Sequence, residues 1–252
     1  MAGLPFTQEG AITTNCPASC AVAGTFGGMS IVIAGGHGRV ALMVSRLLAD
    51  RGDRVLGIIR RPEQSDAVRA AGARPCVSDL AATSVKQFAQ YVDGAQAVLF
   101  AAGAGLGDAP GRANPVDHDA IVALADAAEL VGVRRFVMLS VMGADPARHY
   151  LADPLVETFL RARGRADEDL LARCALSTTV VRPAWFRDRP GTGRVSLSAS
   201  TGPGEIPRAD VAAVLAALLT APATTPRVVE LISGPLSVAE AVNRIVPPPP
   251  GA

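Results

Sequence analysis

From residue 29 onward, short apolar runs alternate with longer stretches in which apolar residues recur at helical spacing. The first run, 30–34, is rich in β-branched residues and is bounded by glycines, which is typical of a strand buried on both faces. Further strands of this kind are predicted at 54–59, 74–77, 97–101, 135–140, 178–182 and 228–232.

The stretches between these runs predict helices. Pro62 suits the first turn of one helix and Gly72 its end, because proline fits the start of a helix and glycine fits its C-terminal cap. Strands that alternate with helices predict parallel βαβ units, hence an α/β fold with a doubly wound, mostly parallel sheet and helices on both faces. The predicted helices cover 40–50, 62–71, 117–130, 155–172 and 208–219.

No repeat or linker divides the chain, so we expect one domain over 29–246 and a Pro-rich tail at 247–252. With 49% hydrophobic and 19% charged residues, the composition is that of a globular protein. A net charge of +1 predicts neither nucleic acid nor a membrane as partner. The cysteines are scattered and predict no metal site; they are Cys16, Cys20, Cys76 and Cys174.

Residues 1–28 differ from the rest. No charge occurs from Gly10 to Gly36, and no Lys or Arg precedes Arg39, so the positive region of a signal peptide is lacking. We therefore expect a disordered extension outside the fold, with Met29 as an alternative start of the natural product, and a cytoplasmic location.

The turn between the first strand and its helix carries the strongest chemical signal. Glycines there permit a tight turn and let backbone N–H groups and the helix N-terminus approach a pyrophosphate. After a strand and before a helix, this pattern predicts a dinucleotide site; the alternative is a purely structural turn. The cofactor-binding candidates are Gly35, Gly36, His37, Gly38, Arg39 and Val40.

The end of the second predicted strand bears on the choice of dinucleotide. An NAD(H) site usually has Asp or Glu there to bind the ribose 2′-hydroxyl, whereas this chain has Arg60 and Arg61. Guanidinium groups bind a 2′-phosphate well, and we expect Arg39 to lie near enough to assist. NADP(H) is therefore favoured over NAD(H), and a solvated surface pair is the alternative.

A family resemblance follows from motifs spread over 29–242. The chain resembles the atypical short-chain dehydrogenase/reductases of the NAD(P)H-binding type. The motifs are Gly35 to Ala41, Arg60 with Pro62-Glu63-Gln64, Ser78-Asp79-Leu80, Ala101-Ala102-Gly103, Arg134 to Ser140, Val181-Arg182-Pro183, Gly191 to Val195 and Ile206 to Ala212.

The resemblance implies a seven-stranded Rossmann sheet and a cofactor site with defined contacts. In that site Asp79 and Leu80 would flank the adenine. The ribose would lie against Ala101, Ala102 and Gly103, and the nicotinamide against Pro183.

The catalytic pair of such relatives is missing. They carry Tyr-x-x-x-Lys on the helix after Ser140, but here Phe159 and Arg163 stand at those positions. Phenylalanine cannot donate a proton, while Arg163 could still reach the nicotinamide ribose. The chain contains one lysine, Lys86, and neither of its two tyrosines is followed four residues later by it.

Three residues are candidates to replace the missing acid. Ser140 ends the fifth predicted strand, where ligands bind in such sheets, and could polarise a carbonyl. His149 and Tyr150 follow on a loop and could protonate a product. A hydrogen-bonded serine at a strand end and two solvated loop residues are the alternatives.

The segment after Pro183 indicates a substrate class. Trp185 and Phe186 could stack on a flat substrate, with arginines at 187, 189 and 194 pairing to its anionic groups. Alternatively, Trp185 anchors the loop to the core. Arginines at 161, 163 and 165 share a helix with acidic residues 167–169, which indicates a solvated face.

Two functions remain open. One is an NADPH-dependent reductase of a small or flat acceptor, similar to the flavin and biliverdin reductase group, in which the cofactor supplies the hydride. The other is a non-catalytic NADP(H)-binding redox sensor or regulatory protein, which the lost Tyr/Lys pair favours.

Overall fold

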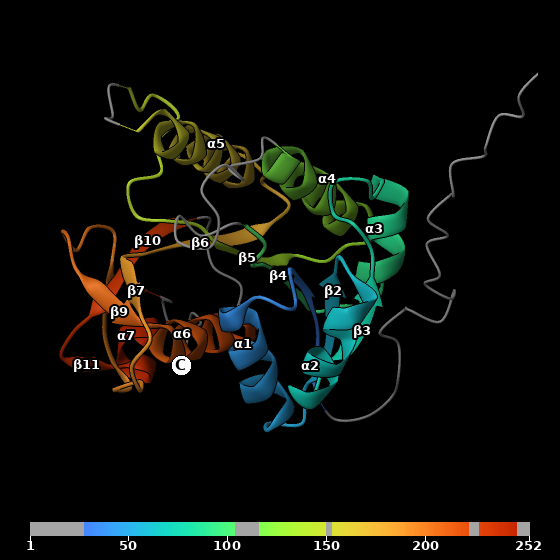
Figure 1. The fold of residues 1–252 in the computed structure, drawn as a ribbon, viewed down its shortest axis with the longest axis horizontal. Coiled ribbons are helices and arrows are strands. Elements are labelled where there is room, and N and C mark those ends of the chain that lie inside the picture. The colour runs from blue at the N-terminus through green and yellow to red at the C-terminus, as the bar shows by residue number, and fades with distance from the viewer. Residues whose placement is uncertain (1–27, 104–115, 150–152, 222–226, 246–252) are drawn as a thin grey trace, which may run out of the picture.

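The computed structural model describes residues 28–103, 116–149, 153–221 and 227–245 (Figure 1). The seven strands predicted from the apolar runs are all present and parallel, which confirms the α/β fold class. They are β1 (Ser30–Ala34), β2 (Arg54–Ile59), β3 (Arg74–Val77), β4 (Ala97–Phe100), β5 (Arg135–Leu139), β6 (Ser177–Pro183) and β10 (Arg227–Ser233).

The sheet is larger than expected. Two short strands, β8 (Arg194–Ser198) and β11 (Leu236–Ser237), extend one edge in antiparallel orientation. The expected seven strands thus become nine, in the order β11-β8-β10-β6-β5-β4-β1-β2-β3. A separate parallel pair consists of β7 (Trp185–Arg187) and β9 (Glu205–Pro207).

Helices connect the strands largely as predicted. The expected helix at 62–71 begins as a single 3-10 turn, Pro62–Gln64, before it becomes α-helical. Two helices were not expected, α3 and α7. The α-helices are α1 (Arg39–Ala49), α2 (Ser65–Ala70), α3 (Val85–Val92), α4 (Val116–Leu130), α5 (Pro154–Leu171), α6 (Arg208–Thr220) and α7 (Val238–Ile245).

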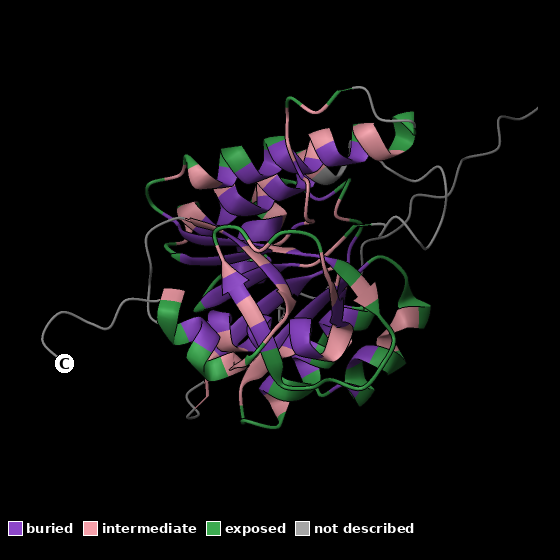
Figure 2. Ribbon diagram, turned by 90° about the vertical axis from the view of Figure 1, so that its left-hand side faces the viewer, coloured by how far each residue is buried: buried purple, intermediate pink, exposed green. Residues whose placement is uncertain are grey.

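Alternate residues of each central strand enter two separate cores. Ile31 and Ile33 of β1 pack into the core beneath α1 and α6, whereas Val32 packs into the core beneath α3 and α4. All three side chains are fully buried, because helices cover both faces of the sheet (Figures 1 and 2). No helix in the described ranges is long and apolar enough to span a bilayer.

The strand order reverses between β1 and β4. From β1 the chain builds β2 and β3 on one side and then crosses to β4, β5 and β6 on the other. In a doubly wound sheet this switch point leaves a crevice at the carboxyl ends of the strands, where ligands bind. Gly35, Ala101 and Ser140 follow β1, β4 and β5 and so meet at that edge.

Candidate functional site

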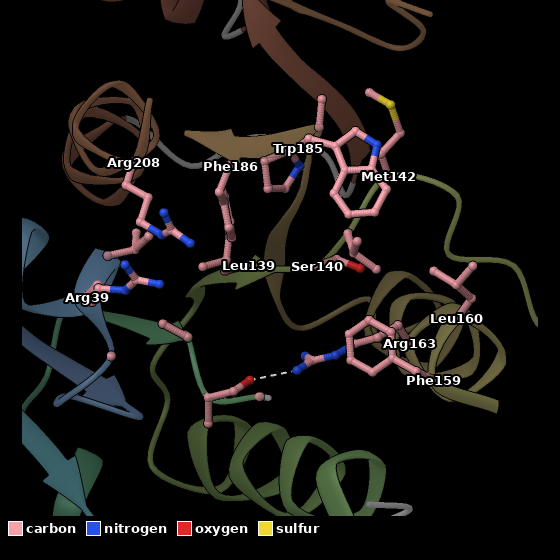
Figure 3. A pocket seen from close by; sticks show the side chains of 18 of the residues that line it. Arg39, Leu139, Ser140, Met142, Phe159, Leu160, Arg163, Trp185, Phe186 and Arg208 are labelled. Atoms are coloured by element: carbon pink, nitrogen blue, oxygen red, sulfur yellow. Dashed lines mark hydrogen bonds between the residues drawn. The ribbon is translucent and has the colours of Figure 1, made fainter. Parts of the chain in front are cut away.

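A cavity of about 480 Å³ lies at this edge of the sheet (Figure 3). Its wall is formed by the start of α1, the ends of β4, β5 and β6, one face of α5, and the segments around β7 and β9. Of the predicted site residues, the cavity brings together Gly38, Arg39, Val40, Ala101, Ala102, Gly103, Ser140, Arg163 and Pro183.

The glycines of the first turn are required by close packing. Gly35 has a φ of +82°, and a Cβ there would lie 2.6 Å from backbone atoms of Ala102. A Cβ on Gly36 would lie 2.7 Å from the Cα of Gly57. The turn is therefore held tightly between β2 and β4, with the N-terminus of α1 directed at the cavity.

The N-terminus of α1 fits an anionic ligand. Gly38 is its N-cap residue and provides no side-chain cap, and the first turn of the helix contains no acidic residue. Unpaired N–H groups and the helix dipole favour an anion there. This uncapped helix end, on a glycine turn after β1, matches what the pyrophosphate of a dinucleotide requires.

The end of β2 is coupled to the same turn through Gln64. Its Oε1 accepts hydrogen bonds from the backbone N–H groups of Arg60 and Arg61, both 3.1 Å away. Its Nε2 lies 3.3 Å from Nδ1 of His37. Both arginines are exposed, and they form no ion pair with any described residue.

Arg163 joins α5 to the end of β4. Its Nη2 donates to the Ala102 carbonyl oxygen over 2.7 Å, and its guanidinium lies 5.5 Å from the centre of the Phe159 ring. The side chain is only 5% exposed, yet it lines the cavity. Arg163 is thus fixed between the segment 101–103 and Phe159.

Ser140 belongs to a buried polar network. Its Oγ donates to Oδ2 of Asp167 over 2.9 Å, and Nε and Nη2 of Arg182 reach the same oxygen, each at 2.8 Å. Asp167 is fully buried, and its Oδ1 has no hydrogen-bond partner among the described residues. Burial raises the pKa of Asp167 above its usual range, although Arg182 and Ser140 oppose that shift.

The sequence interpretation of the α5 charges was therefore wrong in part. Arg163 and Asp167 are buried, whereas Arg165 and Glu168 on the same helix are exposed. The local pattern shows mixed charges, and only the position of Arg182 at the end of β6 explains why Asp167 can be buried. Asp167 and Arg182 were not singled out as site residues.

The other candidate acids lie apart from this network. His149 is half exposed, with Nδ1 3.8 Å from Oε1 of Glu157, and it does not line the cavity. Tyr150 falls outside the described residues. Of the described lining residues, Ser140 alone carries a hydroxyl group.

The predicted adenine contacts lie away from the cavity. Asp79 is exposed after β3, and its Oδ1 accepts from the backbone N–H of Ala81 over 3.1 Å. Leu80 is half-buried against the α3/α4 core. Among the described residues, no cluster of His, Cys, Asp and Glu could hold a metal ion.

Trp185 faces the cavity and is not buried in the core. It is 71% exposed and lines the cavity, so the alternative in which it anchors the loop is wrong (Figure 3). Arg187 and Arg189 do not line the cavity; both pair with Glu205, at 2.6 and 3.0 Å. Arg194 also lies outside it and donates to the Pro235 carbonyl oxygen.

Two other arginines line the cavity, Arg39 at the start of α1 and Arg208 at the start of α6. Arg39 Nη1 pairs with Oδ2 of Asp188 at 2.9 Å, and Arg208 Nη1 pairs with Oδ1 of the same carboxylate. The Arg208 guanidinium lies 5.0 Å from the centre of the Phe186 ring. Arg39 was expected near the cofactor, whereas Arg208 and Asp188 were missed.

Comparison with known proteins agrees with this geometry. The curated protein YhfK of Bacillus subtilis, named an uncharacterized sugar epimerase, is 29% identical over 218 residues, which are 86% of this chain and all of YhfK. A solved structure from Bacillus halodurans, provisionally described as an NAD-dependent epimerase/dehydratase, superposes with a TM-score of 0.75 at 28% identity, over 86% of this chain and all of that one.

A more distant structure shares the fold. The anaerobillin reductase ChuY of Escherichia coli O157:H7 has a TM-score of 0.68 at 21% identity, over 83% of this chain and 99% of its own. A family model described as NAD(P)H-binding matches residues 35–222, from the glycine turn to just beyond α6. The chain therefore belongs to this NAD(P)H-binding family, and the resemblance to the atypical short-chain dehydrogenase/reductases fits that assignment.

Proposed function

We propose that this protein is an NADPH-dependent reductase of a small, flat acceptor that works without a Tyr/Lys pair. The observation that carries the proposal is a cavity that extends without interruption from the uncapped N-terminus of α1 to Ser140. Cofactor phosphates at one end and an acceptor at the other would thus share one space. ChuY, one of the reductases among the solved structures with this fold, is named an anaerobillin reductase, and we take this name to agree with a flat acceptor.

The chain offers contacts for each part of the cofactor. The N–H groups after Gly38 would bind the pyrophosphate. Arg163, fixed against the Ala102 carbonyl, would lie beside the nicotinamide ribose. Pro183, at the end of β6 and in the cavity wall, would lie against the nicotinamide ring.

NADP(H) is proposed over NAD(H) because of Arg60 and Arg61. Both are exposed at the end of β2, and Gln64 fixes their backbone against the glycine turn. No acidic residue occupies this strand end to bind a ribose 2′-hydroxyl. Their guanidinium groups would bind the 2′-phosphate instead.

Ser140 is proposed to orient and polarise the acceptor. When bound, the reduced cofactor supplies the hydride, so the protein has to position the acceptor and deliver one proton. Ser140 can deliver a proton into the cavity if Asp167 is protonated, because the carboxyl then donates to Oγ and frees the serine hydrogen. The raised pKa of Asp167 supports this exchange. Solvent would return the proton.

The redox-sensor alternative is favoured by one observation. In the structure the Ser140 hydroxyl donates inward to Asp167 and not into the cavity. With phenylalanine at 159, a chain in which Asp167 stays ionised would bind NADP(H) and lack a proton donor.

The experiment that separates the two functions combines binding with turnover. NADPH and NADH are titrated into the full chain, and NADPH oxidation is then followed with flavins, quinones and aldehydes as acceptors. A reductase binds NADPH more tightly than NADH and oxidises it with at least one flat acceptor. Tight binding with no turnover supports the sensor, and no NADPH binding contradicts both.

A further inference from the structure

Two arginines from separate helices bind the two oxygens of one carboxylate. Arg39 pairs with Oδ2 of Asp188 and Arg208 with Oδ1. Both arginines line the cavity, whereas Asp188 does not. Figure 3 shows Arg39 and Arg208 directed at one another from α1 and α6, on the opposite side of the view from Trp185 and Phe159.

The cavity wall carries charge of one sign. The charged residues among its described lining are Arg39, Arg163 and Arg208, and none of the lining residues is acidic. Arg163 is engaged by the Ala102 carbonyl. Arg163 is also proposed to bind the nicotinamide ribose, so the positive charge left for an acceptor is concentrated at the other two arginines.

We propose that Arg39 and Arg208 form an anion subsite for the acceptor, which Asp188 occupies in this structure. The acceptor is then a planar molecule that bears a carboxylate or a phosphate ester. Its ring would lie between Trp185 and Ser140, and its anion would displace Asp188 from the two arginines. This inference rests on the proposed reductase function and specifies its substrate class.

Asp188 is replaceable because other contacts hold its segment. Arg187 and Arg189 both pair with Glu205, and β7 pairs with β9. Asp188 is 62% exposed and Arg39 is 52% exposed, so water screens this ion pair strongly. A ligand anion that displaces Asp188 therefore loses little and leaves the segment in place.

Arg208 is the residue of the proposed subsite whose replacement separates acceptor binding from cofactor binding. Arg39 begins α1 and would lie beside the cofactor pyrophosphate, so its loss would affect both ligands. Arg208 is only 16% exposed and is oriented by the Phe186 ring. A half-buried, oriented guanidinium makes charge-assisted hydrogen bonds at low entropic cost.

Flavin mononucleotide and riboflavin provide matched probes, because they share the planar ring system and differ in one phosphate. Their dissociation constants are measured by fluorescence titration of the full chain with and without NADP⁺, which does not allow turnover. Arg208→Gln should weaken flavin mononucleotide binding about tenfold. Asp188→Asn should strengthen it about threefold. Riboflavin binding should change in neither variant, and Arg189→Gln is the matched control outside the cavity.

Several outcomes overturn the inference. The unaltered chain could bind both flavins equally or bind neither. Arg189→Gln and Arg208→Gln could lose the same amount of affinity for flavin mononucleotide. Finally, Arg208→Gln could bind NADP⁺ less well but flavin mononucleotide normally. The last result would assign Arg208 to the cofactor. Failure to bind NADP⁺ together with a retained preference for flavin mononucleotide would contradict the reductase and leave the subsite standing.

Discussion

Ser140 donates its hydroxyl hydrogen to Asp167 over 2.9 Å, and this bond joins the only hydroxyl among the described cavity-lining residues to a fully buried carboxyl. Arg182 holds the same carboxylate oxygen. The arrangement links the protonation of Asp167 to the direction of the Ser140 hydroxyl.

Replacing Ser140 tests whether this hydroxyl takes part in the reaction. Ser140→Ala should lower kcat for NADPH-dependent acceptor reduction by about tenfold or more, since removal of a group that polarises or protonates the acceptor has effects of this order. The dissociation constant for NADPH should stay within about twofold, because Ser140 is not proposed to bind the cofactor. Steady-state kinetics and a titration measure both. Ser198→Ala is the control, since Ser198 lies on β8 away from the cavity; an unchanged kcat in Ser140→Ala would remove Ser140 from the mechanism.

Asp167 should make stability depend on pH in a defined direction. Its pKa is raised on folding, mainly by burial, so the native chain binds this proton more tightly than the unfolded chain does. Its contribution to stability is full below the unfolded pKa and is lost as pH rises through the folded pKa. Each tenfold difference in proton affinity between the folded and the unfolded chain corresponds to about 1.4 kcal/mol.

Asp167→Asn removes that titration while keeping the shape of the side chain. The free energy of unfolding of the original chain, relative to Asp167→Asn, should therefore fall as pH increases from about 4 toward neutrality. Urea unfolding of both proteins at several pH values gives this difference in the free energy of unfolding. The contributions of the other carboxylates are common to both proteins and cancel in the difference. A difference that is constant, or that rises with pH, would show that Arg182 keeps Asp167 ionised.

Arg163 should contribute to cofactor binding through its fixed position. Arg163→Met removes the charge and the hydrogen bond to the Ala102 carbonyl, and NADPH binding should weaken by about tenfold or more, as for loss of a charged hydrogen bond. Arg165→Met, an exposed change on the same helix, is the control for a general effect on α5. Circular dichroism identifies variants that fail to fold. Equal NADPH affinity in both folded variants would separate Arg163 from the cofactor.

The parallel strands and the glycine turn could be predicted because their signals are local. The run 30–34 is apolar throughout and is followed directly by Gly35, so strand and turn are both visible in the sequence. β8 was missed because polar residues fill alternate positions of this short strand near the edge of the sheet. α3 and α7 were missed because each has only eight residues and a narrow apolar face, so its sequence resembles that of a loop.

The site was only partly predictable because its key contacts join distant segments. Asp167 has charged neighbours in the sequence, a pattern that predicts a solvated side chain. Its burial depends on Arg182, which lies in another element. Asp188 and Arg208 likewise meet Arg39 only in the fold. The aromatic pair after Pro183 could be identified from sequence, but its arginine partners could not.

The central claim is that the cavity holds NADPH in one orientation for hydride transfer to a flat acceptor. The most direct test is NADPH oxidation by the full chain with flavin mononucleotide as acceptor, using NADPH deuterated at either the pro-R or the pro-S position of C4. We predict that NADPH oxidation requires the protein and that deuterium slows it at only one of the two positions, because a bound nicotinamide presents one face to the acceptor. If the protein does not accelerate NADPH oxidation, or if the two deuterated forms are oxidised at the same rate, this claim is contradicted.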